Sequence, residues 1–380
     1  MRRATRGRWA AAVALLALLT ACGPDGPEPA PSSPAATPPS TTAAAGPSGP
    51  ATVAVTGVDE ILGDLDVPWG LAFLPDAEVA VTLRDAARLI LVGADGAATT
   101  VTGPGADQLT DLVVPAGEGG LLGVAVLGSS GSSVDLALYA TTADDNRVLR
   151  GTLDGSTLGE LRPIVTGIHK AGNHDGGRLA VGPDGHLYVT TGDAGDRPSA
   201  QDPDSLNGKI LRVTRDGDPA PGNPVAGSPV WSLGHRNVQG LGWSPDGRMF
   251  ASEFGQDTWD ELNVIEPGGN YGWPQVEGSS DDPAFVAPVA TWATDQASPS
   301  GLAVTDEGVY LAALRGERLW RVPLTADGVG TPQALLDGQY GRLRAVAVAP
   351  DGSLWVMTNN TDGRGDPRAG DDRILRVVVG

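Results

Sequence analysis

The chain of 380 residues contains 54 Gly, 31 Pro and a single Cys, and its formal net charge is −20. Hydrophobic residues make up 41%, which suffices for a large core, and the excess of Gly indicates a fold rich in turns. The acidic charge argues against binding to nucleic acid and against docking on anionic lipid through a basic patch. One Cys excludes a disulfide framework and any metal site built from several cysteines.

The N-terminus has the pattern of an export signal. Several arginines precede the apolar run Ala10–Leu19, which is too short to cross a bilayer. The following Leu19-Thr20-Ala21-Cys22 resembles the bacterial lipobox, in which the Cys becomes the acylated first residue. We expect residues 1–21 to be a lipoprotein signal peptide and Cys22 to be lipidated, which would anchor the exported protein at the outer face of the bacterial cell membrane. The alternative is an ordinary signal peptide with an incidental Cys.

A Pro-rich segment follows the signal. Gly23–Pro50 contains nine Pro among Ser, Thr, Ala and Gly, a composition that cannot form a core. We interpret residues 22–52 as a lipidated Cys and a disordered tether, with the folded domain at residues 53–380.

A short motif recurs through that domain: an apolar strand, a turn rich in Pro, Asp and Gly, and a second apolar strand. This is the pattern of a β-hairpin. Its clear copies are Leu71–Asp76, Leu179–Gly185, Leu241–Gly247, Leu302–Gly308 and Val346–Gly352, and a weaker one is Leu122–Val126. Copies recur about every 50 to 60 residues, which predicts an all-β, six-bladed β-propeller. A β-sandwich or a pair of β domains is the alternative, and Val53–Leu65 could add a strand to the last blade.

Propellers place ligands at the mouth of the central channel, on loops between blades. The segment Gly172–Arg178 lies directly before a predicted first strand and contains His174. Asp193 follows the second strand of the same blade and could meet this histidine. A carboxylate on one imidazole nitrogen would leave the other nitrogen free to act as a base. The alternative is a loop histidine that stabilises a turn.

Acidic and cationic residues mark further loops. The segment Ser252–Asp257 and its neighbours offer the oxygen ligands that Ca²⁺ prefers, or they form a solvated acidic loop. Arg315, Arg342 and Arg344 lie at predicted starts of other blades. Arginines gathered in so acidic a protein suggest convergence on an anion, although each alone could be a surface charge.

These motifs together resemble the soluble-type pyrroloquinoline quinone (PQQ) dependent sugar dehydrogenases, also called aldose sugar dehydrogenases. The resemblance extends from Val67 to the C-terminus. It rests on six stretches taken in order, which are Val67–Gly70, Gly117–Gly123, Asn173–Arg178, Gly234–Asn237, Gly268–Pro274 and Arg342–Arg344.

The resemblance implies a propeller that binds PQQ and Ca²⁺. It makes His174 the catalytic base, Asp193 the carboxylate that orients it, and Arg236 the residue above the quinone. The backbone carbonyls of Gly255 and Gln256 correspond to the Ca²⁺ ligands. Further residues correspond to cofactor contacts, namely Glu118, Asn237, Arg315, Arg342 and Arg344.

The implied reaction is oxidation of an aldose at C1 to an aldonolactone. The histidine removes the hydroxyl proton, hydride passes to the quinone, and Ca²⁺ and Arg236 stabilise the developing negative charge. The electrons then pass to an external acceptor such as a quinone, a cytochrome or a dye.

Three departures from the family pattern stand out. Glu118 replaces a common Gln and adds an anion beside a polyanionic cofactor, Arg315 stands near the place of a Lys, and Gln256 replaces a Pro. Two other functions therefore stay open. One is a non-enzymatic propeller lipoprotein that binds sugar or protein, for which Glu118 is the main indication. The other is a Ca²⁺-dependent lactonase, which would need carboxylate ligands at the channel centre.

Overall fold

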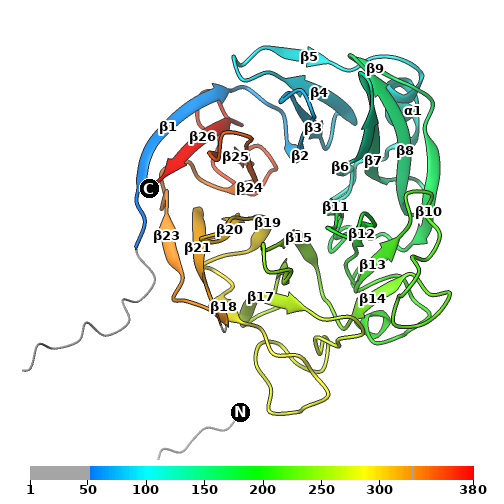
Figure 1. The fold of residues 1–380 in the computed structure, drawn as a ribbon, viewed down its shortest axis with the longest axis vertical. Coiled ribbons are helices and arrows are strands. Elements are labelled where there is room, and N and C mark those ends of the chain that lie inside the picture. Colours follow the sequence, from blue (N-terminus) through cyan, green and yellow to red (C-terminus); the bar gives the residue numbers. More distant parts are fainter. Residues whose placement is uncertain (1–51, 327) are drawn as a thin grey trace, which may run out of the picture. The chain divides into compact units, whose positions relative to one another are not determined.

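The protein is described by a computed structural model of residues 52–326 and 328–380. The predictions for the signal peptide, for Cys22 and for almost all of the tether lie outside the described residues. The described chain forms six antiparallel sheets arranged in a ring (Figure 1), which confirms the six-bladed β-propeller. Within the described residues, no helix has the length and apolar character needed to cross a membrane.

Each blade runs from an inner strand at the channel to an outer strand at the rim. Blade 1 consists of β2 (Pro68–Phe73), β3 (Val79–Leu83), β4 (Arg88–Val92) and β5 (Ala98–Thr100). Blade 2 consists of β6 (Leu121–Ser130), β7 (Ser133–Thr141), β8 (Asn146–Asp154) and β10 (Arg162–Ile168), with the short β9 (Thr157–Leu158) paired to β8. Blade 3 consists of β11 (Leu179–Val181), β12 (Leu187–Thr190), β13 (Lys209–Val213) and β14 (Val230–Leu233).

The second half of the ring repeats this order. Blade 4 consists of β15 (Val238–Trp243), β16 (Met249–Glu253), β17 (Trp259–Ile265) and β18 (Ala290–Ala293). Blade 5 consists of β19 (Pro299–Val304), β20 (Gly308–Ala313) and β21 (Arg318–Thr325), which pairs with both β22 (Gly328–Val329) and β23 (Gln333–Leu335). Blade 6 consists of β24 (Leu343–Val348), β25 (Leu354–Thr358), β26 (Ile374–Val379) and β1 (Val55–Leu62).

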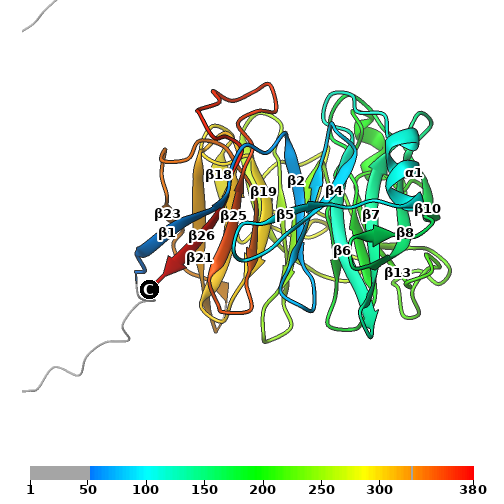
Figure 2. The same cartoon turned by 90° about the horizontal axis from the view of Figure 1, so that it is seen from above.

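The first and last strands close the ring. β1 pairs antiparallel with β26, as expected from the apolar stretch at Val53–Leu65, and the two lie side by side in both views (Figures 1 and 2). The N-terminal strand β1 therefore supplies the fourth strand of blade 6, whose other three strands come from the C-terminal part of the chain. This pairing closes the ring, so that only short sheet edges are left unpaired.

Inner strands approach one another too closely for side chains at some positions. A Cβ on Gly70 of β2 would lie 2.6 Å from the carbonyl oxygen of Leu122, in β6 of the next blade. A Cβ on Gly123 would lie 2.2 Å from the carbonyl oxygen of Gly177. Glycine is therefore required where the blades crowd around the channel.

Helices contribute little to the fold. α1 (Pro104–Leu112) precedes blade 2, and its Leu109 is buried in an apolar cluster with Leu89 and Leu158. A short 3₁₀ helix, η1 (Arg197–Ala200), lies in the loop after β12.

The connections divide between two faces of the ring. Turns between first and second strands, which include the repeated Pro-Asp-Gly turns, lie on one side, here called the turn face. Loops between second and third strands and the loops that join successive blades lie on the other side, here called the loop face. Arg315 follows β20 and therefore lies in a second–third loop. Its predicted place at the start of a blade is wrong, because β20 continues to Ala313 and the next blade starts only at β24.

Candidate active site on the loop face

A cavity of about 390 Å³ opens on the loop face, and it collects most of the predicted site residues. Seven of them line it, namely Glu118, His174, Arg236, Gly255, Gln256, Arg315 and Arg342. They come from inter-blade loops and second–third loops in different blades. Asp193, Asn237 and Arg344 are buried and do not line the cavity, but each lies close to a residue that does.

His174 and Asp193 form a hydrogen-bonded pair. The imidazole Nδ1 lies 2.7 Å from the Asp193 carboxylate, which is fully buried. Nδ1 therefore carries a proton that it donates to Asp193, and Nε2 is the acceptor nitrogen of the ring. The side-chain amide of Asn173 lies 3.3 Å from Nε2. The sequence prediction that these two residues meet is confirmed by this contact.

Several donors hold Asp193 in its ionised form. Burial alone would raise its pKa, but hydrogen bonds from His174 and from the Gly195 amide outweigh burial and keep the pKa below the ordinary value. The indole N–H of Trp273 also donates to this carboxylate, at 2.8 Å. An ionised Asp193 at pH 7 fixes both the orientation and the tautomer of the histidine.

The backbone of His174 is strained, and hydrogen bonds from neighbouring loops hold it in place. Its φ of 60° lies in the left-handed region, which a residue with a side chain seldom adopts. Its N–H donates to Oε2 of Glu118 at 2.9 Å. The carbonyl oxygen of His174 accepts a hydrogen bond from the Ala194 amide at 3.2 Å. These contacts fix the main chain on which the imidazole is mounted.

Arg236 lines the same cavity, and its carbonyl oxygen accepts the Asp193 N–H at 2.8 Å. Its guanidinium donates to the side-chain oxygen of Gln256 at 2.8 Å and to the Phe254 carbonyl at 3.2 Å. The guanidinium also lies 5.5 Å from the ring centre of Trp273. Burial lowers the pKa of Arg236 from its ordinary value, and nearby carboxylates oppose that shift. The residue is a well-fixed cation at the edge of the cavity.

One loop presents the two carbonyls expected to bind Ca²⁺. A single oxygen of Glu277 accepts four backbone N–H groups, from residues 256–259, at 2.8 to 3.0 Å. The Gly255 amide donates to Asp260 at 2.8 Å. A Cβ on Gly255 would lie 2.0 Å from the carbonyl oxygen of Trp259, so only glycine fits. Among the described residues, no group donates a hydrogen bond to the carbonyl oxygen of Gly255 or to that of Gln256.

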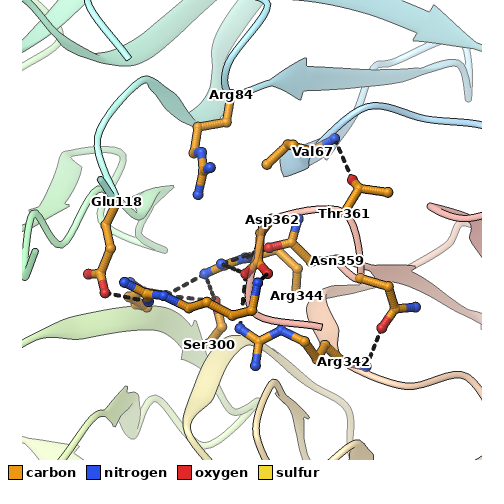
Figure 3. A network of polar contacts seen from close by, with 12 residues as sticks. Val67, Arg84, Glu118, Ser300, Arg342, Arg344, Asn359, Thr361 and Asp362 are labelled. Carbon is orange, nitrogen blue, oxygen red and sulfur yellow. Dashed lines mark hydrogen bonds and ion pairs between the residues drawn. The ribbon is translucent and has the colours of Figure 1, made fainter. Parts of the chain in front are cut away.

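Arg342 and Arg344 lie next to each other and share an acid. Asp362 accepts a hydrogen bond from Arg342 at 2.9 Å and lies 3.7 Å from Arg344 (Figure 3). Arg344 also donates twice to Asn359 and once to Gln239. Burial lowers the pKa of the Arg344 guanidinium, and the neighbouring Asp362 opposes that shift. Arg342 alone of the two reaches the cavity.

Two donors beside the cavity have no internal partner. Within the part of the chain that the structure describes, Nε of Arg342 and Nδ2 of Asn237 are buried without a hydrogen bond. The other end of the Asn237 amide accepts the Gly176 N–H at 3.1 Å, which ties it to the His174 loop. Buried polar groups are nearly always paired, so these donors indicate a ligand or solvent that supplies an acceptor.

A family model described as glucose/sorbosone dehydrogenase matches residues 65–375. The chain belongs to the glucose/sorbosone dehydrogenase family. The matched range starts shortly before β2 and ends within β26, so it includes almost the whole ring apart from β1.

Solved and curated proteins are similar to large parts of this chain. The PQQ-bound aldose sugar dehydrogenase from Streptomyces coelicolor is 50% identical, with a TM-score of 0.80 over 87% of this chain and 98% of that one. The aldose sugar dehydrogenase YliI of Escherichia coli is 30% identical over 82% of this chain and 92% of its own length. Quinoprotein glucose dehydrogenase B of Acinetobacter calcoaceticus is 31% identical over 60% of this chain and 54% of its own length.

Sequence reasoning missed several residues of the site. Arg364 lines the cavity, whereas Asp362 and Glu277 hold residues that line it. The Asp-Gly-Arg sequence at 362–364 in the last long loop was an available indication, because it places charges in a second–third loop. Trp273 belonged to a quoted motif, but nothing local indicated its bond to Asp193.

Proposed function

We propose that this protein oxidises aldose sugars at C1 to aldonolactones, with PQQ and Ca²⁺ as cofactors and an external electron acceptor. The observation that carries the proposal is the His174–Asp193 pair beside a cavity with several arginines on its wall. Family membership and the PQQ-bound relative at 50% identity support the same chemistry.

The residues present fit PQQ, which is a planar quinone with several carboxyl groups. Four guanidinium-bearing residues line the cavity, in a protein whose net charge is −20. They are Arg236, Arg315, Arg342 and Arg364. The unpaired donors of Arg342 and Asn237 add sites for acceptor oxygens. Arg236, Arg315 and Arg342 line the cavity and would hold the cofactor by charge and hydrogen bonds.

The residues also fit Ca²⁺, which takes oxygen ligands. The carbonyls of Gly255 and Gln256 have no donor among the described residues, and the Glu277 contacts fix the loop that carries them. A calcium ion there would be completed by oxygens of the cofactor, and it would add positive charge beside Arg236.

The chain's own part in the reaction is proton removal and positioning. Nε2 of His174 is the unprotonated nitrogen, so it takes the proton of the sugar's C1 hydroxyl once the sugar replaces the Asn173 amide as its partner. Asp193 stabilises the imidazolium that forms, and Trp273 keeps Asp193 in place. Arg236 favours negative charge on a group bound in the cavity. PQQ, when bound, supplies the two-electron acceptor for the hydride from C1.

Transfer of electrons outward would suit an exported protein. We propose that the lipobox-like Leu19–Cys22 segment anchors the protein outside the cell membrane, where a quinone or a cytochrome could accept electrons. The tether would let the propeller reach such a partner.

The two alternative functions find less support in the geometry. Glu118, the main indication for a non-enzymatic binding protein, is paired with Arg364 and the His174 amide rather than left as a free anion. A lactonase would need carboxylate ligands at the channel centre, and residues 52–326 and 328–380 contain no group of three or more His, Cys, Asp or Glu placed to hold a metal.

The direct test is dye-linked oxidation of a panel of aldoses by the purified protein, with PQQ and Ca²⁺ omitted in turn. The proposal expects turnover that requires both and that gives lactone as the product. Turnover without PQQ, or lactone hydrolysis without sugar oxidation, would contradict it.

A further inference from the structure

Glu118 raises an electrostatic problem for a cavity that binds a polyanion. Its side chain is only 17% exposed and lines the cavity. One oxygen, Oε2, accepts the His174 N–H, and this contact supports the strained backbone of the proposed base. A carboxylate in this place is useful for His174 but adds a negative charge where anionic carboxylates would bind.

Arg364, which lies close to the C-terminal end of the chain, compensates the negative charge of Glu118. Its guanidinium lies 2.7 Å from Oε1 of Glu118, although the residues are 246 positions apart. Glu118 belongs to the loop that leads into blade 2, whereas Arg364 belongs to the β25–β26 loop of blade 6. Figure 3 shows Glu118 facing the polar network around Arg342, Arg344 and Asp362. The ion pair therefore bridges the cavity wall across blade 1.

The ion pair with Arg364 affects the pKa of Glu118. Burial would raise its pKa, but the contacts with Arg364 and with the His174 amide outweigh burial and lower it. Glu118 is therefore ionised at pH 7, and the charge of Arg364 balances it. The backbone N–H of Arg364 donates to Asp362 at 2.9 Å, which links this contact to the arginine pair.

We propose that Arg364 is a positioning residue that acts through Glu118. It neutralises the carboxylate that holds the His174 backbone, so the Glu118–Arg364 pair adds no net charge to the cavity. This inference rests on the proposed function, because it concerns the affinity for an anionic cofactor.

A double-mutant cycle tests the inference by PQQ binding rather than by turnover. The apoprotein and the variants R364Q, E118Q and E118Q/R364Q are titrated with PQQ in Ca²⁺-containing buffer, and binding is followed by absorbance. R364Q leaves Glu118 uncompensated and should weaken PQQ binding about tenfold at low salt, less at 1 M salt. E118Q keeps an acceptor for the His174 N–H but leaves the positive charge of Arg364 unbalanced, so it should tighten PQQ binding at low salt. The double variant should return to within about twofold of the wild type.

Arg162 provides a matched control. Its side chain is 53% exposed, against 54% for Arg364, and it pairs with a carboxylate too, that of Asp216, but it lies on the outer strand β10. R162Q should bind PQQ as the wild type does. Thermal unfolding of each variant tests whether Arg364 has a purely structural role. In that case R364Q should lower Tm, and adding E118Q should not restore PQQ binding.

The outcomes are distinguishable. If R364Q binds PQQ like the wild type, or if the double variant binds as weakly as R364Q, charge compensation is overturned while the proposed function stands. If the wild type itself does not bind PQQ, the proposed function fails and this inference fails with it.

Discussion

The repeated turns of the turn face and the site on the loop face are held by different kinds of contact. On the turn face, aspartates bond within their own turns: Asp184 accepts the His186 amide and Asp351 accepts the Ser353 amide. On the loop face, side chains bond across long separations, as Asp193 does with Trp273, 80 residues away. Repeated local contacts shape the blades, and single long-range contacts shape the site. Substitutions should therefore affect the faces differently.

The largest expected effect is the loss of the base on the loop face. H174A should lower kcat by about 10³-fold or more, because no other group replaces the imidazole, while PQQ binding stays largely intact. D193N should also lower kcat strongly, since an amide can accept from His174 but cannot stabilise the imidazolium. Stopped-flow reduction of bound PQQ measures both. Turnover like that of the wild type in H174A would remove the proposed base.

A buried acid beneath His174 should give the next largest effect, on stability. Burial raises the pKa of Asp175 to about 6, and among the described residues its Oδ2 has no hydrogen-bond partner. Because the folded state then holds a proton that the unfolded state has lost, the free energy of unfolding falls as pH rises from about 4 to 6. D175N removes this contribution and should be more stable than the wild type at pH 7 by about 1–3 kcal/mol.

Urea unfolding of wild type and D175N at pH 4, 5, 6 and 7 checks the sign. The two curves should diverge as pH rises through this window. Parallel curves would show that the pKa of Asp175 is not raised in the folded state.

A smaller effect is expected at the loop of Gly255 and Gln256, which is proposed to bind Ca²⁺. E277Q weakens the acceptor for the four amides of residues 256–259 and should reduce Ca²⁺ affinity about tenfold, because charge-assisted hydrogen bonds are roughly twice as strong as neutral ones. Calorimetric Ca²⁺ titration in the presence of PQQ measures this. The exposed Glu160 offers a control, and E160Q should leave the affinity unchanged. Equal affinities for wild type and E277Q would show that Glu277 does not organise the loop.

The smallest effect should come from the turn face. Asp76 is exposed and accepts the Glu78 amide at 3.2 Å within its own turn. D76A should cost about 0.5–1 kcal/mol of stability and leave PQQ affinity and kcat unchanged. Thermal unfolding and the dye-linked assay together test this contrast. A loss of activity in D76A would show that the turns of the turn face also contribute to the site.

The same contrast explains what the sequence could predict. The blades follow from a local repeat, since each turn lies within a few residues of the strands it joins. His174 and Asp193 were predictable because both lie at the ends of strands in one blade. The Glu118–Arg364 and Asp193–Trp273 contacts join different blades, so no local spacing indicates them. The place of Arg315 was mistaken because a second–third loop and an inter-blade loop carry similar residues.

The central claim is that the loop-face cavity holds PQQ over the His174–Asp193 pair. A crystal structure of the protein soaked with PQQ and Ca²⁺ tests it most directly. We expect the cofactor between Arg236 and Arg342, with a cation on the carbonyls of Gly255 and Gln256. PQQ bound on the turn face, or a cavity in which His174 is separated from the cofactor, would contradict the account.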